Sequence, residues 1–107
     1  MSPADAIAML DRQIGKHGQS LKFKRGDGAV APMRGFVRSF KAGELVGTLK
    51  QGDRSIVLSP TALGAFGPPK GQDKVSFHAG GSATVQSAEL VHLNDTLVRI
   101  NLVVRGD

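Results

Sequence analysis

The sequence predicts a mainly β protein: a small antiparallel β-barrel or sandwich of about six strands, with one short N-terminal helix and a long glycine-rich loop. Two observations carry this prediction. From Gln19 to the end of the chain, short stretches in which apolar and polar residues alternate recur, as half-buried strands require. Turns rich in glycine, proline and aspartate separate these stretches, which favours a barrel or sandwich. A length of 107 residues corresponds to a single domain, residues 1–107.

A helix is predicted over residues 3–16. Ser2 is a favourable N-cap residue, and Pro3 suits the first helical position. Apolar residues then recur at helical spacing and form a narrow stripe: Ala6, Ile7, Leu10 and Ile14. Gly15 or Gly18 ends the helix. We expect this helix to lie on the domain or to contact a neighbouring subunit.

The predicted barrel, residues 19–107, opens with a strand from Gln19. Its mostly apolar face carries Leu21 and Phe23 together with Arg25, and its basic face carries Lys22 and Lys24. A turn at residues 26–28 separates this strand from the next.

The second strand is predicted over residues 33–40. Phe36 and Phe40 share one face of it with Arg34 and Arg38. Either the arginine stems lie over apolar surface or this face is only partly buried.

Residues 41–52 contain three glycines and few bulky side chains, which indicates a long, mobile hairpin arm or loop. A strand over residues 53–59 and a capped helical turn at 59–63 follow. The chain is then expected to close with a three-strand antiparallel meander over residues 74–78, 82–92 and 96–105.

The basic residues are unevenly distributed. The net charge is +5, and nine of the fourteen lysines and arginines fall between Arg12 and Lys50. Such a field attracts polyanions, including nucleic acid, although it also suits a plain solvated face. The sequence has no Tyr or Trp for base stacking and no helix-turn-helix or zinc-finger pattern, so sequence-independent contact with the phosphate backbone is the form of binding that fits. The candidate DNA-facing residues are Lys22, Lys24, Arg34, Arg38 and Arg54.

Catalysis is not expected. The chain has no cysteine, and its three histidines, His17, His78 and His92, do not stand at metal-ligand spacings. It contains no Gly-x-Ser-x-Gly nucleophile motif and no pair of carboxylates that suggests acid–base work. We therefore predict no enzyme activity, no metal and no cofactor. Neither a signal sequence nor an apolar stretch of membrane-spanning length is visible, so a soluble protein without membrane contact is expected.

Several segments together resemble a known class of proteins. They are a glycine-rich arm that includes Glu44-Leu45-Val46-Gly47 and Gln51-Gly52-Asp53, the strand and turn at residues 56–61, a Pro-x-x-Gly-x-Asp-x-Val pattern at 68–75, and the terminal strands with Leu97–Ile100 and Val103–Gly106. With this pattern the chain resembles the head–tail joining, or head-completion (stopper), proteins of tailed bacteriophages and prophages. The resemblance covers most of the chain from Gln19 onward.

The resemblance implies a β-barrel that assembles as a homo-oligomeric ring, a hexamer or dodecamer, below the portal of the virion. Such a ring extends and closes the DNA channel in the virion neck, after assembly in the host cytoplasm. Its partners would be the portal or an adaptor protein, tail-terminator or tail proteins, and the packaged DNA. By the same resemblance, the glycine-rich arm would contact neighbouring subunits or constrict the channel, through Lys41, Glu44, Leu45, Val46, Leu49 and Lys50.

Two other functions remain open on the sequence. The chain could be a tail or tail-terminator component with a similar barrel. It could also be a small, non-specific nucleic-acid-binding β-barrel unrelated to virions, whose affinity for free DNA or RNA would fall steeply with salt.

Overall fold

The computed structural model describes residues 2–26, 28–39, 53–78 and 80–106. A helix, α1 (Pro3–His17), precedes six strands and two short 3-10 turns, η2 (Pro60–Ala62) and η3 (Gly64–Phe66). The strands are β1 (Gln19–Lys24), β2 (Val30–Ser39), β3 (Asp53–Leu58), β4 (Lys74–Phe77), β5 (Ser82–Leu93) and β6 (Thr96–Gly106). The predicted arm at 41–52, with Lys41, Glu44, Leu45, Val46, Leu49 and Lys50, lies outside the described residues.

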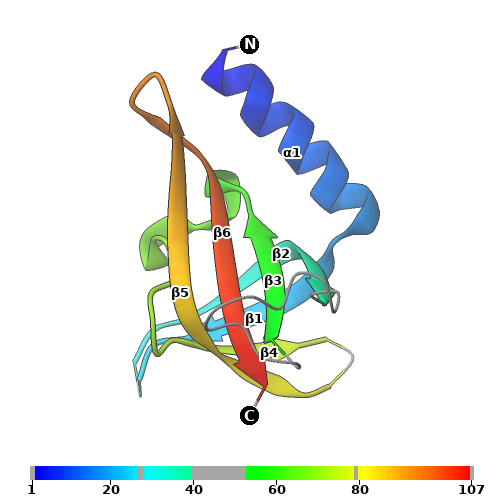
Figure 1. Ribbon diagram of the computed structural model, residues 1–107, viewed down its shortest axis with the longest axis vertical. Helices are drawn as coiled ribbons and strands as arrows, with labels where there is room; N and C mark the ends of the chain where they lie inside the picture. The colour runs from blue at the N-terminus through cyan, green and yellow to red at the C-terminus, as the bar shows by residue number, and fades with distance from the viewer. Residues whose placement is uncertain (1, 27, 40–52, 79, 107) are drawn as a thin grey trace.

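The six strands form a closed antiparallel barrel in the order β1-β2-β3-β6-β5-β4, which confirms the predicted fold (Figure 1). The barrel closes because β1 pairs with β2 on one side and with β4 on the other. In this order β1 and β4 are neighbours, and they lie across the barrel from β6 and β3. The strand order therefore gives the barrel two opposite outer faces.

Alternation along the strands fills the barrel interior. Leu21 and Phe23 of β1 point inward and are buried, whereas Lys22 and Lys24 are exposed. The core consists of aliphatic side chains, one methionine and two phenylalanines: Leu21, Phe23, Met33, Ile56, Leu58, Leu63, Phe66, Val75, Ala83, Val85, Ile100, Leu102 and Val104. The core of this chain, which has no Trp or Tyr, is therefore mainly aliphatic.

Two strand boundaries beside the first turn differ from the prediction, and the ends of β3, β4, β5 and β6 differ from it by one residue each. The second strand begins at Val30 rather than Met33, because β1 and β2 stay paired up to the turn, where Lys24 lies opposite Val30. The first strand ends at Lys24, and Arg25 follows it in the turn, where its backbone N–H donates to the carbonyl of Ala29. Local alternation indicates a strand but does not fix where its pairing stops.

The β5–β6 hairpin is longer than the other strand pairs and continues beyond the barrel (Figure 1). Its turn consists of Asn94 and Asp95, both with positive φ, a conformation that these two residue types tolerate. Leu90 pairs with Ile100 in register, but Leu90 is 44% exposed while Ile100 is fully buried. The outer part of this hairpin is therefore a ribbon that projects past the core.

The helix begins as the sequence predicts and ends one residue later, at His17. The Ser2 hydroxyl accepts a hydrogen bond from the Asp5 N–H at 3.1 Å, and the Gly18 N–H donates to the Ile14 carbonyl at 2.7 Å. Ile14 is the one buried residue of α1. The helix lies on its own barrel, along β6 and β2, which is one of the two positions expected for it.

Candidate binding surfaces

The predicted basic residues do not form one surface. Lys22 and Lys24 lie on the outer face of β1, beside β4. Arg34, on the outer face of β2, lies one diagonal step from Lys22 in the register. Arg38 lies further along β2, opposite Ser55 of β3. Arg54 is elsewhere: its guanidinium lies 5.2 Å from the ring centroid of Phe77, at one end of the barrel.

The outer face of β1 and β4 carries a cluster of lysines that includes a residue not predicted as DNA-facing. Lys24 is directly opposite Lys74 of β4, and both are exposed. Lys74 Nζ donates to Thr84 Oγ1 of β5 at 2.6 Å. Like charges directly opposite each other on two strands are destabilising, so this pair is a cost to the fold. Lys22, Lys24 and Lys74 form what we term the basic face.

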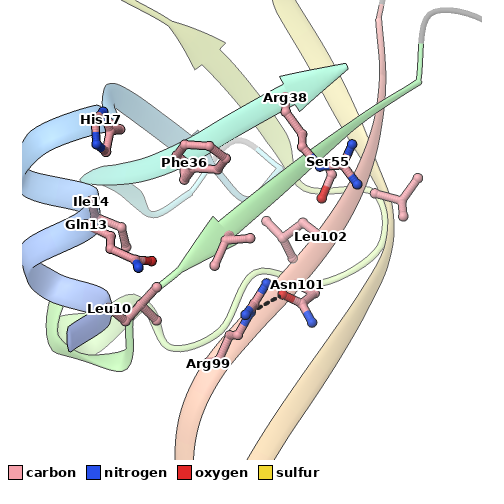
Figure 2. Close-up of a pocket in the computed structure, with 12 residues that line it drawn as sticks. Leu10, Gln13, Ile14, His17, Phe36, Arg38, Ser55, Arg99, Asn101 and Leu102 are labelled. Carbon is pink, nitrogen blue, oxygen red and sulfur yellow. Dashed lines mark hydrogen bonds between the residues drawn. The ribbon is translucent and has the colours of Figure 1, made fainter. Parts of the chain in front are cut away.

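On the other side of the barrel, α1 and the outer face of β2, β3 and β6 enclose an open groove of about 610 Å³ (Figure 2). Its apolar lining comes from Leu10, Ile14, Phe36, Val57, Leu102 and Val103. Its polar lining comes from Gln13, His17, Arg38, Ser55, Arg99 and Asn101. No acidic residue occurs among the described residues that line it. We term this surface the helix groove.

Three contacts hold α1 in place as the wall of the helix groove. Ile14 is buried between the helix and the barrel. Asp11 Oδ2 accepts a hydrogen bond from Thr61 Oγ1 of η2 at 2.9 Å. Arg34 Nη2 donates to the carbonyl of Gly18 at 2.9 Å, at the C-terminal end of the helix dipole, where a cation is favourable. The C-terminal half of the helix, from Asp11 onward, is thus fixed to the barrel.

Phe36 forms part of the floor of the helix groove. Its side chain lies between α1 and β3 in Figure 2, yet it remains 36% exposed. Of the two alternatives left open for this face of β2, that exposure supports partial burial. A large apolar side chain that stays open to water between two walls is typical of a surface that binds another molecule.

The polar rim of the groove is organised by β6. Arg99 Nε donates to Asn101 Oδ1 at 2.7 Å, and Asn101 Nδ2 donates to Glu89 Oε1 of β5 at 2.9 Å. This chain of hydrogen bonds orients the Arg99 guanidinium at one end of the groove, as seen in Figure 2. The groove therefore combines an apolar floor with a positive charge at its edge.

Two ion pairs hold the ends of the barrel strands. Arg25 Nη2 lies 2.9 Å from Asp73 Oδ2 and also donates to the carbonyl of Pro68 at 3.2 Å. On the other side, Arg105 and Asp53 face each other across β6 and β3, and their bidentate contact has distances of 2.9 and 3.1 Å. Hydrogen bonding to these carboxylates raises the pKa of Arg25 and of Arg105 above the ordinary arginine value.

Both aspartates are buried, which is uncommon for acidic residues unless they are paired. Asp73 does accept the Lys70 N–H at 2.8 Å, as in a turn, but it is also buried beside Arg25. Asp53 is the first residue of β3 and is almost fully buried. Their partners are about fifty residues away in the sequence, so no local pattern could reveal these pairs. We assign both pairs to fold stability.

The remaining candidate chemistry is sparse. His78 directly follows β4 and His92 lies near the end of β5, both exposed, as expected for residues beside turns. Within the described residues, no three His, Asp or Glu side chains gather closely enough to hold a metal ion. The described part of the chain also contains no helix with the length and hydropathy needed to cross a membrane.

A comparison with models of known protein families and with curated proteins finds no match for this chain. Its function must therefore be inferred from the surfaces themselves.

Proposed function

We propose that this chain is a structural component of a tailed phage or prophage virion: a head–tail connector of the head-completion (stopper) class. Copies of the chain would form a ring, a hexamer or dodecamer, below the portal. That ring would extend and close the DNA channel and dock the tail. The partners would be the portal or an adaptor protein, tail-terminator or tail proteins, and the DNA that passes through the channel.

One observation carries the proposal: the basic face and the helix groove are separate surfaces of one barrel. The basic face belongs to β1 and β4, and the groove floor belongs to β2, β3 and β6. Lysines on an open sheet face suit the phosphate backbone of DNA, whatever its sequence. An apolar groove with a charged rim suits a protein. A single copy could therefore contact DNA and a protein at the same time, as a subunit of a ring around DNA must.

The resemblance to head-completion proteins adds to this argument. Its Pro-x-x-Gly-x-Asp-x-Val pattern, at residues 68–75, contains Asp73 and leads into β4. Arg25 binds Asp73 and the carbonyl of Pro68 directly after β1. The pattern thus belongs to the segment that leads into β4, the strand whose pairing with β1 closes the barrel. Within it, Asp73 holds this segment to the end of β1 through Arg25.

The test is co-sedimentation of the purified chain with DNA-filled, tailless heads from the strain whose genome carries the sequence. We expect stoichiometric binding and reduced leakage of DNA from the heads. Free duplex DNA serves as the control. A chain that binds neither heads nor DNA would contradict the proposal and favour a tail or tail-terminator component.

The lysines of the basic face also favour a second candidate, a non-specific nucleic-acid-binding barrel. Lys24 and Lys74 lie opposite each other despite the electrostatic cost, which a polyanion would offset. Tight, salt-sensitive binding to free DNA without any binding to heads would support this candidate and contradict the connector.

Both candidates make the same prediction for the basic face. Replacing Lys24 and Lys74 by glutamine should lower the slope of log affinity against log salt for duplex DNA by about 2, since each lost phosphate contact removes about 0.9. Lys24→Gln alone, which leaves the hydrogen bond from Lys74 to Thr84 in place, should raise the stability by a few tenths of a kcal/mol, because it removes the like-charge pair. Fluorescence anisotropy over a salt series and chemical denaturation measure the two effects.

The matched control is Lys16→Gln on α1, since Lys16 is also exposed but lies outside the basic face. If Lys16→Gln lowers the salt slope as much as a single substitution on β1 or β4 does, the basic face is not the DNA contact.

A further inference from the structure

The helix groove requires an occupant with two properties. Its floor, around Phe36 and Val57, needs apolar side chains, and its rim, at Arg99, favours a carboxylate. The cavity of about 610 Å³ is only partly enclosed, which suits a helix laid into it more than a small enclosed ligand. The chain itself can be searched for such a segment.

Four large apolar side chains of the described residues are clearly exposed: Met9, Val30, Phe36 and Leu90. Phe36 belongs to the groove. Val30 lies opposite Lys24 of the basic face. Leu90 projects from the β5–β6 ribbon, where its neighbour Glu89 points to the opposite face of the strand. None of these three combines an apolar side chain and a carboxylate on one free surface.

Met9 does combine them. Asp5, Ala8, Met9 and Arg12 lie together on one exposed side of α1. Asp5 and Met9 are four residues apart, so they lie on the same face of the helix. Met9 is 43% exposed, and Ala8 and Asp5 are exposed as well. We term this surface the helix knob.

We propose that the helix knob of one copy docks into the helix groove of the next copy, with Met9 on the apolar floor beside Phe36 and Asp5 near Arg99. The groove is lined by the neighbouring stripe of α1, which includes Leu10, Ile14 and His17, while Met9 also borders a hollow beside Val98 and Arg99 of its own copy. One helix can therefore form a wall of the groove in its own copy and also occupy the groove of a neighbouring copy. Such a contact is head-to-tail, and it generates a ring when the rotation closes. This inference rests on the proposed ring and names the contact that builds it.

Sedimentation equilibrium of the full chain tests the contact. We expect reversible self-association that Met9→Lys and Ala8→Lys each weaken at least tenfold, because a buried ammonium has no partner on the apolar floor. Leu90→Lys is the matched control, since Leu90 and Met9 are 44% and 43% exposed. A chain that stays monomeric up to millimolar concentration, or an association equally sensitive to Leu90→Lys, overturns the proposal. Circular dichroism confirms that each variant keeps its helix.

Two further experiments separate a specific contact from a general loss of association. Asp5→Arg and Arg99→Glu should each weaken association, and the chain that carries both should recover it, because the reversed charges meet across the interface. Mixing Met9→Lys with Phe36→Lys should give a one-to-one dimer and nothing larger, since one intact knob and one intact groove remain. Assembly of that mixture beyond the dimer contradicts the head-to-tail arrangement.

The outcome is distinguishable from that of the proposed function. If the chain binds heads with Met9→Lys binding as well as the unaltered chain, the knob-to-groove contact is wrong while the connector stands. If copies associate through the knob and groove but no copy binds heads, the connector is wrong while the contact stands.

Discussion

Replacing Arg25 by methionine should destabilise the barrel by about 2–3 kcal/mol. Asp73 would lose its cationic partner while its side chain stays only 6% exposed, and breaking a buried ion pair from one side costs about 3–5 kcal/mol. We expect a smaller loss than for a fully buried pair, because the Arg25 side chain is 36% exposed and water screens part of its charge. Methionine keeps much of the volume of the arginine stem, so the change isolates the guanidinium.

The guanidinium has three functions at this point. It binds Asp73 before β4, it donates to the carbonyls of Phe66 and Pro68 at 3.2 Å, and its central carbon lies 4.2 Å from the ring centroid of Phe66. Phe66 in turn packs on Phe23, with ring centroids 6.5 Å apart. One side chain thus ties the end of β1 to the segment between η3 and β4.

Urea denaturation of Arg25→Met, Asp73→Asn and the double variant measures the coupling between the two residues. We expect the double variant to be less destabilised than the sum of the single ones, because removing both charges leaves no unpaired group. A loss of less than about 0.5 kcal/mol for Arg25→Met, as for an average surface substitution, would contradict the assignment.

The effect of Arg25→Met should be the same at pH 6 and at pH 9. The hydrogen bond with Asp73 raises the pKa of Arg25 above its ordinary value, burial opposes this shift, and the charge of Asp73 adds to it. A raised pKa means that Arg25 contributes its stability below the pKa of the unfolded chain and loses it only as pH rises through the folded pKa. That loss lies at strongly alkaline pH, outside the range tested.

Two glycines three residues apart should respond to alanine in opposite directions. At Gly18, a Cβ would collide with the Ile14 carbonyl oxygen and would lie 2.9 Å from Ile14 Cγ2 and 3.0 Å from the Gly35 carbonyl oxygen. Two of these three atoms belong to the backbone and cannot turn aside, so we expect Gly18→Ala to destabilise the protein by about 2 kcal/mol. The contact with Gly35 also implies that α1 would move away from β2.

Gly15→Ala is the matched substitution. A Cβ at Gly15 meets nothing within 4 Å, and Gly15 lies inside α1, where alanine is favoured over glycine by about 0.5–1 kcal/mol. We therefore expect Gly15→Ala to raise the free energy of unfolding. Denaturation midpoints of the two variants give the comparison. If both substitutions change the free energy of unfolding in the same direction, the close packing at Gly18 does not govern the position of the helix.

Much of the fold could be predicted because its signals are local. Ser2, Pro3 and Gly18 mark the ends of α1, and alternation from Gln19 onward marks the strands. Barrel closure was left open against a sandwich, because it depends on the pairing of β1 with β4, about fifty residues apart. Because Arg25 continues the alternation of Leu21 and Phe23, the sequence suggested that it lies on the apolar face of a strand. In the structure Arg25 instead binds Asp73, a carboxylate of that distant segment.

The candidate surfaces were less predictable for the same reason. Lys22 and Lys24 were correctly expected on the exposed face of their strand, but Lys74 joins them only through the register of β1 and β4. The helix groove requires α1 to lie along β2 and β6, which no pattern within the helix specifies. The residues proposed for the arm at 41–52 remain a prediction from the sequence.

Closure of the barrel has a further consequence for how copies could meet. Each described strand of the barrel wall has a hydrogen-bonded neighbour on both sides over part of its length, whereas residues 87–93 of β5, in the projecting ribbon, pair with β6 alone. Where the strands are paired on both sides, contacts with another copy must be made by side chains alone. Their strength and selectivity can be altered by one substitution at a time, without the register slips that accompany association through strand edges.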